Sequence, residues 1–429
     1  LVPSLAGTGL GAASGRVSGA VLVTAGGLRD LEHAGGRVDL ETVEVTVGDV
    51  RVESVVPVRV AVEDGTARIE RARFRAPGSQ LRVSGEASLE RGLGLELDSE
   101  IDLSLLPQIT PAVREAEGTL RLALALTGAF ADPEVFGEAT LEGASMSLTA
   151  LAAPVEDLHG HATFTSRRIL IEEVAARISG GDVLVRGEVV LERRAIERWR
   201  LHVAAEHLSF EPLEGIAVTF SADTTVTGAD EVGGLPTVTG ELVVEHFVYE
   251  RPIGLGGATL EELTRTERAE TATWDPGLAS VALDLSVRAD APFVVSNNLV
   301  QGELSIDSEE RGFRFVGTDQ RFGAIGDLRF DRGTIYFRNT AFDVRPGGLV
   351  AFDSDTSIDP RFDVRAVTEI RRSGDLTAPS WRIILEAEGT RDALTLTTHS
   401  DPDLPQEDIL LLLAIGMTGA ELEALQIGD

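Results

Sequence analysis

The sequence predicts an all-β fold, an elongated array of mostly antiparallel strands, from three observations. Apolar residues alternate with polar ones, as at Leu120, Leu122, Leu124 and Leu126, which is typical of a strand with one apolar face. A strand, glycine, loop, glycine, strand order recurs at intervals of about 100 residues. Few stretches carry the start and stop signals of a helix.

The clearest copy of this repeat is the segment 118–148. Gly128 closes one alternating run, Asp132 and Pro133 stand in the loop, and Gly137 opens the next run. Because proline cannot donate to a central ladder, we expect the first strand to end at Gly128 and a longish loop to complete a hairpin. The same order recurs with the glycine pairs Gly26 and Gly36, Gly228 and Gly240, and Gly317 and Gly326. Two other segments align with Ile69 on Ile171 and Gly85 on Gly187.

The repeats suggest a domain organisation. We expect a flexible entry at 1–18, a β array at 19–400 and a short helical segment at 401–429. The array divides into repeats at 19–127, 128–227, 228–316 and 317–400, with an excursion at 251–280. A length of 429 residues would ordinarily suggest two or three domains, but a repeating strand pattern favours one array whose neighbours bury each other.

The strand runs can be placed in order along the chain. Between Val38 and Val62 the alternation changes parity once, which predicts a β-bulge or a strand break. Further strands are expected at 81–89, 93–97, 183–191, 199–205, 218–226, 281–287, 313–316, 328–330, 335–337, 342–344, 362–366, 381–387 and 394–396.

Helices are expected in two places. One short helix is predicted at 260–268, inside the excursion. The other follows Pro405, where Glu407 and Asp408 precede an apolar run, the arrangement favoured at a helix N-terminus. Thr418 and Glu421 then form a capping-box pattern for another short helix.

Composition excludes several classes of function. The 70 acidic residues outnumber the 38 basic ones, all of them arginine, and the net charge of −32 argues against nucleic acid as a partner. The absence of cysteine excludes disulfides and thiol chemistry. The longest apolar run, Ile409 to Ile415, is far shorter than the ~20 residues that span a bilayer. Since the chain begins at Leu1, we expect a targeting element upstream in a longer protein.

No catalytic or metal constellation is complete. His159 and His161 point to one face of a probable strand, but no third zinc ligand stands at a recognisable spacing. Asp353, Asp355, Ser357 and Asp359 imitate the start of a calcium loop, whereas Ile358 and Val364 occupy the positions that require glycine and glutamate. Known nucleophile, zinc-protease and phosphate-loop motifs are absent. We therefore expect no enzyme, no metal and no cofactor.

The apolar strand faces need a partner. Because the sequence offers almost no helix to cover them, these faces either pack against one another in a closed sandwich or form an open groove that faces an apolar ligand. A parallel β-helix is disfavoured, since its coils would repeat every ~20 to 30 residues. If the groove is open, the alternating apolar residues of these strands are expected to line it. They include Leu122, Leu124, Val185, Leu201, Val203, Leu283, Leu285, Ile383 and Leu385.

The C-terminal end resembles a known family. The run GDLRFDRGTIYFRNTAFDVRPGGLVAFDSDTSIDPRFDVRA, followed by LTLTTHSDPDLPQEDILLLLAIG, is similar to the conserved domain of the TamB family. The upstream repeats, including LTGAFADPEVFGEATLEG, are similar to the units that precede it in that family and in other AsmA-like proteins, so the resemblance covers about residues 19–416.

This resemblance implies a function. It implies an elongated, U-shaped, taco-like β-groove in the periplasm that moves phospholipid between the inner and outer membranes. An alternative is a scaffold subunit of the translocation and assembly module, acting with an outer-membrane barrel of the TamA or BamA type. The expected partners are phospholipid acyl chains and, through the full-length protein, that barrel. The inner-membrane anchor is expected in an N-terminal segment absent from this chain.

Overall fold

The computed structural model describes residues 13–27, 30–130, 132–149, 151, 153–192, 195–228, 234–252, 281–307, 312–337, 340–371, 380–390, 393–415 and 417–418. Strands dominate these residues, and nearly all of the strand pairs are antiparallel, so the predicted all-β class is confirmed. The chain divides into two compact units. Unit 1 comprises Leu1–Glu206 and Thr225–Val232, and unit 2 comprises His207–Thr224 and Gly233–Asp429.

Unit 1 is built from strands joined by tight turns. Its strands are β1 (Ala13–Gly27), β2 (Asp30–Val47), β3 (Val50–Ser54), β4 (Val58–Glu63), β5 (Thr66–Ala76), β6 (Ser79–Ser88), β7 (Gly92–Asp102), β8 (Val113–Ala129), β9 (Asp132–Leu148), β10 (Val155–Thr165), β11 (Arg168–Ile178) and β12 (Gly181–Glu192). β13 (Ala195–Leu213) and β14 (Ile216–Thr227) each contribute residues to both units.

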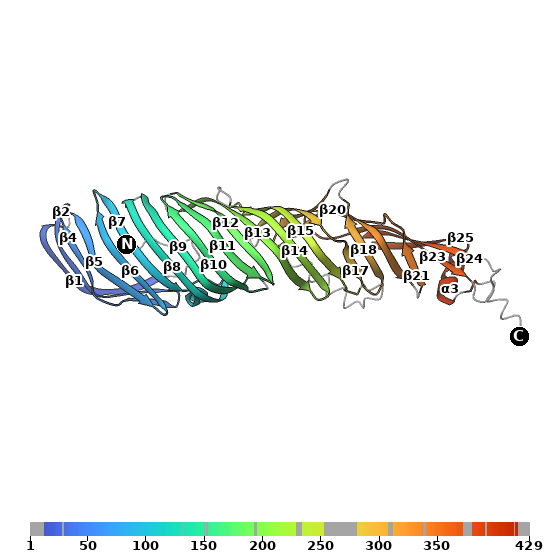
Figure 1. Ribbon diagram of the computed structural model, residues 1–429, viewed down its shortest axis with the longest axis horizontal. Helices are drawn as coiled ribbons and strands as arrows, with labels where there is room; N and C mark the ends of the chain where they lie inside the picture. Colours follow the sequence, from blue (N-terminus) through green and yellow to red (C-terminus); the bar gives the residue numbers. More distant parts are fainter. Residues whose placement is uncertain are drawn as a thin grey trace. The chain divides into compact units, whose positions relative to one another are not determined.

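From β4 to β13 the ladder is an antiparallel meander. Each strand pairs with the next strand in the chain, so β5 to β12 lie side by side in chain order (Figure 1). At the start, β2 pairs with β1 on one side and with β3 and β4 on the other. Every second turn therefore lies at the same edge of the unit.

The hairpin of β8 and β9 was predicted, but its loop was not. Ala129 is paired with Asp132 and Gly128 with Pro133, so both strands run further than expected and the connection is tight. Pro133 lies near the start of β9, where the strand is paired with β8 alone, because the ladder to β10 begins only at Gly137. A proline, which has no N–H to donate, can be accommodated where one side of the strand is unpaired. The expectation that Gly128 ends the strand was wrong for this reason.

The second glycine of each repeat has a physical role. Gly137 lies inside β9 with φ +131°, a value that side chains rarely allow, and an added Cβ would lie 2.0 Å from the carbonyl oxygen of Ala123 on β8. Gly240 is equivalent, with φ +144° and 2.2 Å from the oxygen of Asp223. These residues mark points where a strand twists closely against its neighbour, as glycine kinks do in curved sheets.

The parity change between Val38 and Val62 is a β-bulge. Ser18 pairs with Thr42 and Gly19 with Leu40, so Glu41 is the extra residue of β2. β1 itself begins at Ala13, which makes the last part of the expected flexible entry a strand that is paired with β2.

A short helical segment between β7 and β8 was not predicted. It consists of a 3-10 turn, η1 (Leu103–Leu105), and one helical turn, α1 (Leu106–Ile109). Asp102 caps it, since its carboxylate accepts a hydrogen bond of 2.9 Å from the Ser104 backbone N–H, and Pro107 stands in the first turn.

Unit 2 has a more branched topology. Its further strands are β15 (Thr237–Tyr249), β16 (Ala282–Ala289), β17 (Phe293–Ser296), β18 (Val300–Ile306), β19 (Phe313–Thr318), β20 (Phe322–Phe337), β21 (Thr340–Val344), β22 (Leu349–Ser354), β23 (Arg361–Arg371), β24 (Ser380–Thr390) and β25 (Ala393–Asp401). β15 is parallel to both β16 and β17, and the long strand β20 pairs with β18, β19, β21 and β22.

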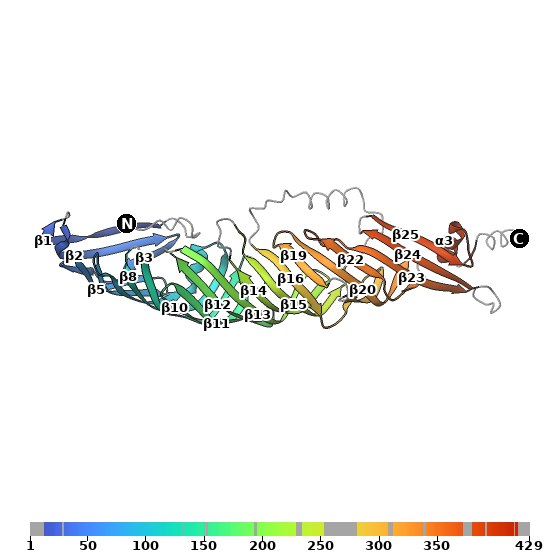
Figure 2. The ribbon, with the colours of Figure 1, turned by 90° about the horizontal axis from the view of Figure 1, so that it is seen from above.

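The predicted helix after Pro405 is confirmed as α3 (Gln406–Ile415), with Glu407 and Asp408 in its first turn. It lies next to β25, which pairs with β24, and β24 pairs with β23 (Figure 2). The Thr340 hydroxyl donates a hydrogen bond of 3.3 Å to the Leu413 carbonyl, so α3 is also tied to β21.

Some expectations fall outside the described residues. These are residues 1–12 of the expected flexible entry, the short helix at 260–268, all but the first two residues of the excursion at 251–280, and Glu421 of the capping-box pattern.

We predict that Gly137→Ala destabilises the fold by about 3 kcal/mol, because the new Cβ has to displace backbone at a left-handed position. The matched control is Gly94→Ala in β7, where the nearest atom to an added Cβ is 3.8 Å away, and stability should be unchanged or slightly higher. Thermal unfolding followed by circular dichroism measures both variants, and equal melting temperatures would refute the argument.

Candidate functional site: the apolar face of unit 1

Unit 1 carries a continuous apolar face that crosses its strands from β5 to β13. In paired register, one row of this face is Ala72, Val83, Leu97, Leu124, Gly137, Phe164, Ile169, Val189 and Trp199. The adjacent row is Phe74, Leu81, Ser99, Leu122, Ala139, Ala162, Ile171, Gly187 and Leu201. We call these two rows, with the row through Leu120 described below, the apolar face. It exists because the period of two is kept in register from strand to strand.

Five of the predicted lining residues lie on this face. Leu122 and Leu201 stand in one row and Leu124 in the next, while Val185 pairs directly with Val203. All five are half-buried, and none belongs to a buried cluster. Their side chains are therefore partly open to solvent, although their strands are fully paired.

Among the described residues, helical segments cover only part of the apolar face. The third row contains Leu120, Leu141 and Val174, and these pack against the buried cluster that includes Leu103 of η1 and, at its margin, Leu106 of α1. The Asp102 cap holds this segment in place. Hydrogen bonds from the backbone and then the hydroxyl of Ser104 lower the pKa of the Asp102 carboxyl below its ordinary value.

The predicted residues of unit 2 have a different environment. Ile383 and Leu385 are 0% and 1% exposed and belong to a large cluster with Ile409, Leu412 and Leu413 of α3. Leu285 is 8% exposed, and only Leu283 is half-buried. Around β23 and β24 these side chains thus form a closed core instead of an accessible surface. Whether any of the nine residues contacts an acyl chain stays a prediction.

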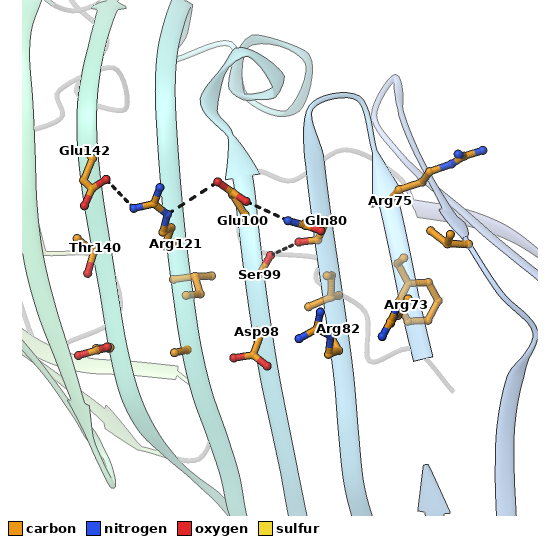
Figure 3. A pocket seen from close by; sticks show the side chains of 16 residues that line it. Arg73, Arg75, Gln80, Arg82, Asp98, Ser99, Glu100, Arg121, Thr140 and Glu142 are labelled. Carbon is orange, nitrogen blue, oxygen red and sulfur yellow. Dashed lines mark hydrogen bonds and ion pairs between the residues drawn. The ribbon is translucent and has the colours of Figure 1, made fainter. Parts of the chain in front are cut away.

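The opposite face of unit 1 is charged. Arg121 forms ion pairs with Glu142 at 2.6 Å and Glu100 at 3.8 Å, and the Gln80 amide donates to Glu100 at 2.9 Å (Figure 3). An open hollow of about 670 Å³ lies among these side chains and those of Arg73, Arg82, Asp98 and Glu138, and Phe74, Leu81 and Leu122 of the apolar face also line it. Since charges of both signs stand in its lining, the hollow suits an acyl chain less well than the apolar face does.

The candidate metal ligands have other partners. His159 Nδ1 lies 2.8 Å from the carbonyl oxygen of Asp157, and His161 Nδ1 lies 3.4 Å from the Thr140 hydroxyl. Asp353 forms an ion pair of 3.4 Å with Arg361. Within the described ranges, no group of three or more His, Cys, Asp or Glu side chains is arranged to hold a metal ion.

Comparison with known families decides the relationship. Residues 172–429, more than half of the chain, match the family model of the TamB C-terminal domain. The chain belongs to the TamB family. No curated protein matches it. Much of the apolar face, from β5 to β10, lies upstream of the segment matched by the TamB model.

Membership of the TamB family supports a role of the TamB type, in the translocation and assembly module or in lipid transport, in a protein of the cell envelope. Among the helices that the structure describes, none has the length and apolar character needed to cross a bilayer.

The sequence reasoning missed part of this site. Leu97, Phe164 and Ile169 belong to the same row as Leu124, and the signal for them was the alternation in neighbouring strands once those strands are aligned. The helical cover at Leu103 and Leu106 could have been found from the Asp102 cap and Pro107, but its two short turns show no helical periodicity.

We predict that aspartate destabilises the fold to very different extents in the two units. Leu385→Asp should destabilise the fold by more than about 4 kcal/mol, because an unpaired charge would be buried in the closed core. Leu124→Asp should cost about 1 kcal/mol, because the carboxylate at a half-buried position can stay hydrated.

The measurement is chemical denaturation of the full chain, with Leu385→Ala and Leu124→Ala as the controls for lost apolar volume. A similar, large loss of stability in both aspartate variants would mean that the apolar face of unit 1 is a closed core as well.

Proposed function

We propose that this chain is a conduit for phospholipid acyl chains and that the apolar face of unit 1 is the surface they contact. One observation carries the proposal. The face runs across nine paired strands, and its residues Leu122, Leu124 and Leu201 are half-buried with no helix of the described residues packed on them. A soluble domain rarely leaves so extended an apolar surface uncovered unless something apolar binds there.

The chemistry of the face fits an acyl chain better than a compact ligand. Its rows consist mainly of Leu, Val, Ile, Ala and Gly, with few aromatic or polar anchors that would recognise a defined shape. Burial of each methylene contributes about 0.8 kcal/mol, so a long hydrocarbon chain can be held by area alone. We therefore expect low selectivity among acyl chains and no catalytic step.

The cellular setting is part of the proposal. Since the family acts in the cell envelope, we propose that the chain works in the periplasm, between the inner and outer membranes, as part of a full-length protein anchored in the inner membrane. In the aqueous periplasm, an acyl chain bound to the apolar face would be removed from water, and so would the face itself. Hydrocarbon could then cross the compartment without being exposed to water.

The test is photocrosslinking to phospholipid from positions on opposite faces of one strand. A photoreactive residue at Leu122 or Leu124 should crosslink to acyl chains, while the same residue at Ala123, between them on the charged face of β8, should not. All three positions lie in the same strand, so folding and labelling efficiency are matched. Equal crosslinking at Ala123 and Leu124, or none at either, would contradict the proposal.

A second candidate function is that of a scaffold that docks an outer-membrane barrel of the TamA type. The observation in its favour is β25, which among the described strands pairs only with β24 and carries no Asp, Glu, Lys or Arg before Asp401. An edge strand with few charges can add a strand from a partner through backbone hydrogen bonds.

The double variant Thr395→Lys with Thr397→Lys should reduce binding of a purified TamA-type barrel at least about tenfold, because charge on an edge opposes strand addition. The added lysines face Glu388 and Glu386 across the ladder, so the fold should be kept. Thr163→Lys on β10, a strand that is paired on both sides, is the control. Unchanged binding of the edge variant, measured by surface plasmon resonance, would remove β25 as the docking site.

A further inference from the structure

One edge of unit 1 is formed by the turns after β4, β6, β8 and β10 and by the start of β13. These turns are neighbours: the Arg91 guanidinium donates to the Thr66 hydroxyl beside the β4–β5 turn at 2.5 Å, and the Val135 N–H donates to the Ser166 carbonyl at 3.1 Å. The Leu191 N–H likewise donates to the Arg167 carbonyl at 2.7 Å, which links the last turns. The turns thus form one row.

This edge combines exposed apolar side chains with arginines, and its turns also carry the exposed acidic residues Glu63, Asp64 and Glu90. Leu89 after β6, Phe130 after β8 and Ile196 at the start of β13 are 63%, 42% and 62% exposed. Arg91 is exposed, and the side chains of Arg167 and Arg168 are 50% and 62% exposed. We call the three apolar residues and the three arginines the arginine edge.

The opposite edge of unit 1 has a different composition. Its tight turns at Gly48 and Asp49, at Pro77 and Gly78, and at Ser179 and Gly180 contain no arginine, and the nearby exposed Asp157 and Asp182 both pair with Arg177. None of the large apolar side chains that are exposed in the described part of unit 1 lies in these turns. Among the described residues, large exposed apolar side chains next to arginines are thus found at one of these two edges.

We propose that the arginine edge binds the interface of a phospholipid bilayer. Leu89, Phe130 and Ile196 would enter the boundary between headgroups and acyl chains, and the guanidinium groups would bind lipid phosphates, to which their planar donors are matched. A row of separate turns suits a flat lipid surface, since each turn reaches the interface independently. Arg167 and Arg168 have carboxylate partners at Asp132 and Glu188, and both retain large exposed areas for a phosphate.

The net charge specifies which bilayer fits. At −32 the chain is repelled by an anionic surface over a Debye length, whereas a zwitterionic bilayer offers phosphates without that repulsion. The arginine edge therefore binds zwitterionic phospholipid in preference to strongly anionic phospholipid, and salt strengthens binding to the anionic surface by screening the repulsion. This inference does not rest on the conduit function, because contact with a bilayer needs no acyl chain on the apolar face.

The experiment is co-flotation of the full chain with phosphatidylcholine vesicles. The triple variant Leu89→Ser, Phe130→Ser, Ile196→Ser should bind about tenfold more weakly than the parent, and Arg91→Gln with Arg168→Gln should also weaken binding. Val55→Ser is the matched control, since Val55 is 50% exposed in unit 1 but lies away from this edge, and it should bind like the parent. The three apolar side chains are exposed, so the melting temperature of the triple variant should stay close to the parent value, and the arginine variant is compared at a temperature where both remain folded.

Three outcomes would overturn the proposal: no binding of the parent chain to zwitterionic vesicles, equal binding of the triple variant, or tighter binding to anionic vesicles at low salt. The same triple variant is also tested for acyl crosslinking at Leu124 with phospholipid supplied in detergent. If the triple variant still crosslinks at Leu124 but no longer binds vesicles, both proposals are supported. If the parent chain itself gives no crosslink at Leu124, the conduit proposal is refuted and the bilayer-binding proposal is not affected.

Discussion

The alternation of apolar and polar residues, held in register by antiparallel ladders, is the constraint on which the rest of this structure depends. A single strand offers one apolar side, but when Leu124, Leu97 and Ile169 fall into the same cross-strand row the sides merge into a face. A slip of one residue would turn that row toward the charged side, where Arg121 and Glu142 lie. The register therefore determines both what holds the sheet together and what it can bind.

The two units use the same pattern with different results. In unit 2 aromatic rings close the core: Phe247 packs on Phe293 with centroids 5.1 Å apart, Phe313 packs on Phe352 at 5.4 Å, and α3 adds Ile409 and Leu412. In unit 1 the rows consist mainly of aliphatic and small residues, and the helical residues that the structure describes pack only on the row of Leu120. An apolar face is left accessible where the side chains are too small and the helices too short to close it.

Most strand positions could be predicted from sequence because alternation is a local signal, as the bulge at Glu41 illustrates. Gly137 was expected to open a strand, but it lies inside β9, because the pairing of Asp132 and Pro133 with β8 extends that strand towards its start. Burial could not be predicted. Leu124 and Leu385 have equivalent patterns in sequence, yet Leu385 is buried because α3 and distant strands pack around it, which no local period records. The helical turns at 103–109 and the pairing of Pro133 were not predicted for the same reason, because short helices and strand ends depend on contacts with neighbouring elements.

The central claim is that the apolar face of this TamB-family chain holds acyl chains. Native mass spectrometry of the full chain after incubation with phospholipid tests it most directly, because bound lipid adds discrete mass to a folded protein. The account predicts adducts of one or more phospholipids that diminish when Leu122 and Leu124 are both replaced by aspartate. A folded chain that carries no phospholipid, or adducts that persist unchanged in that variant, would contradict it.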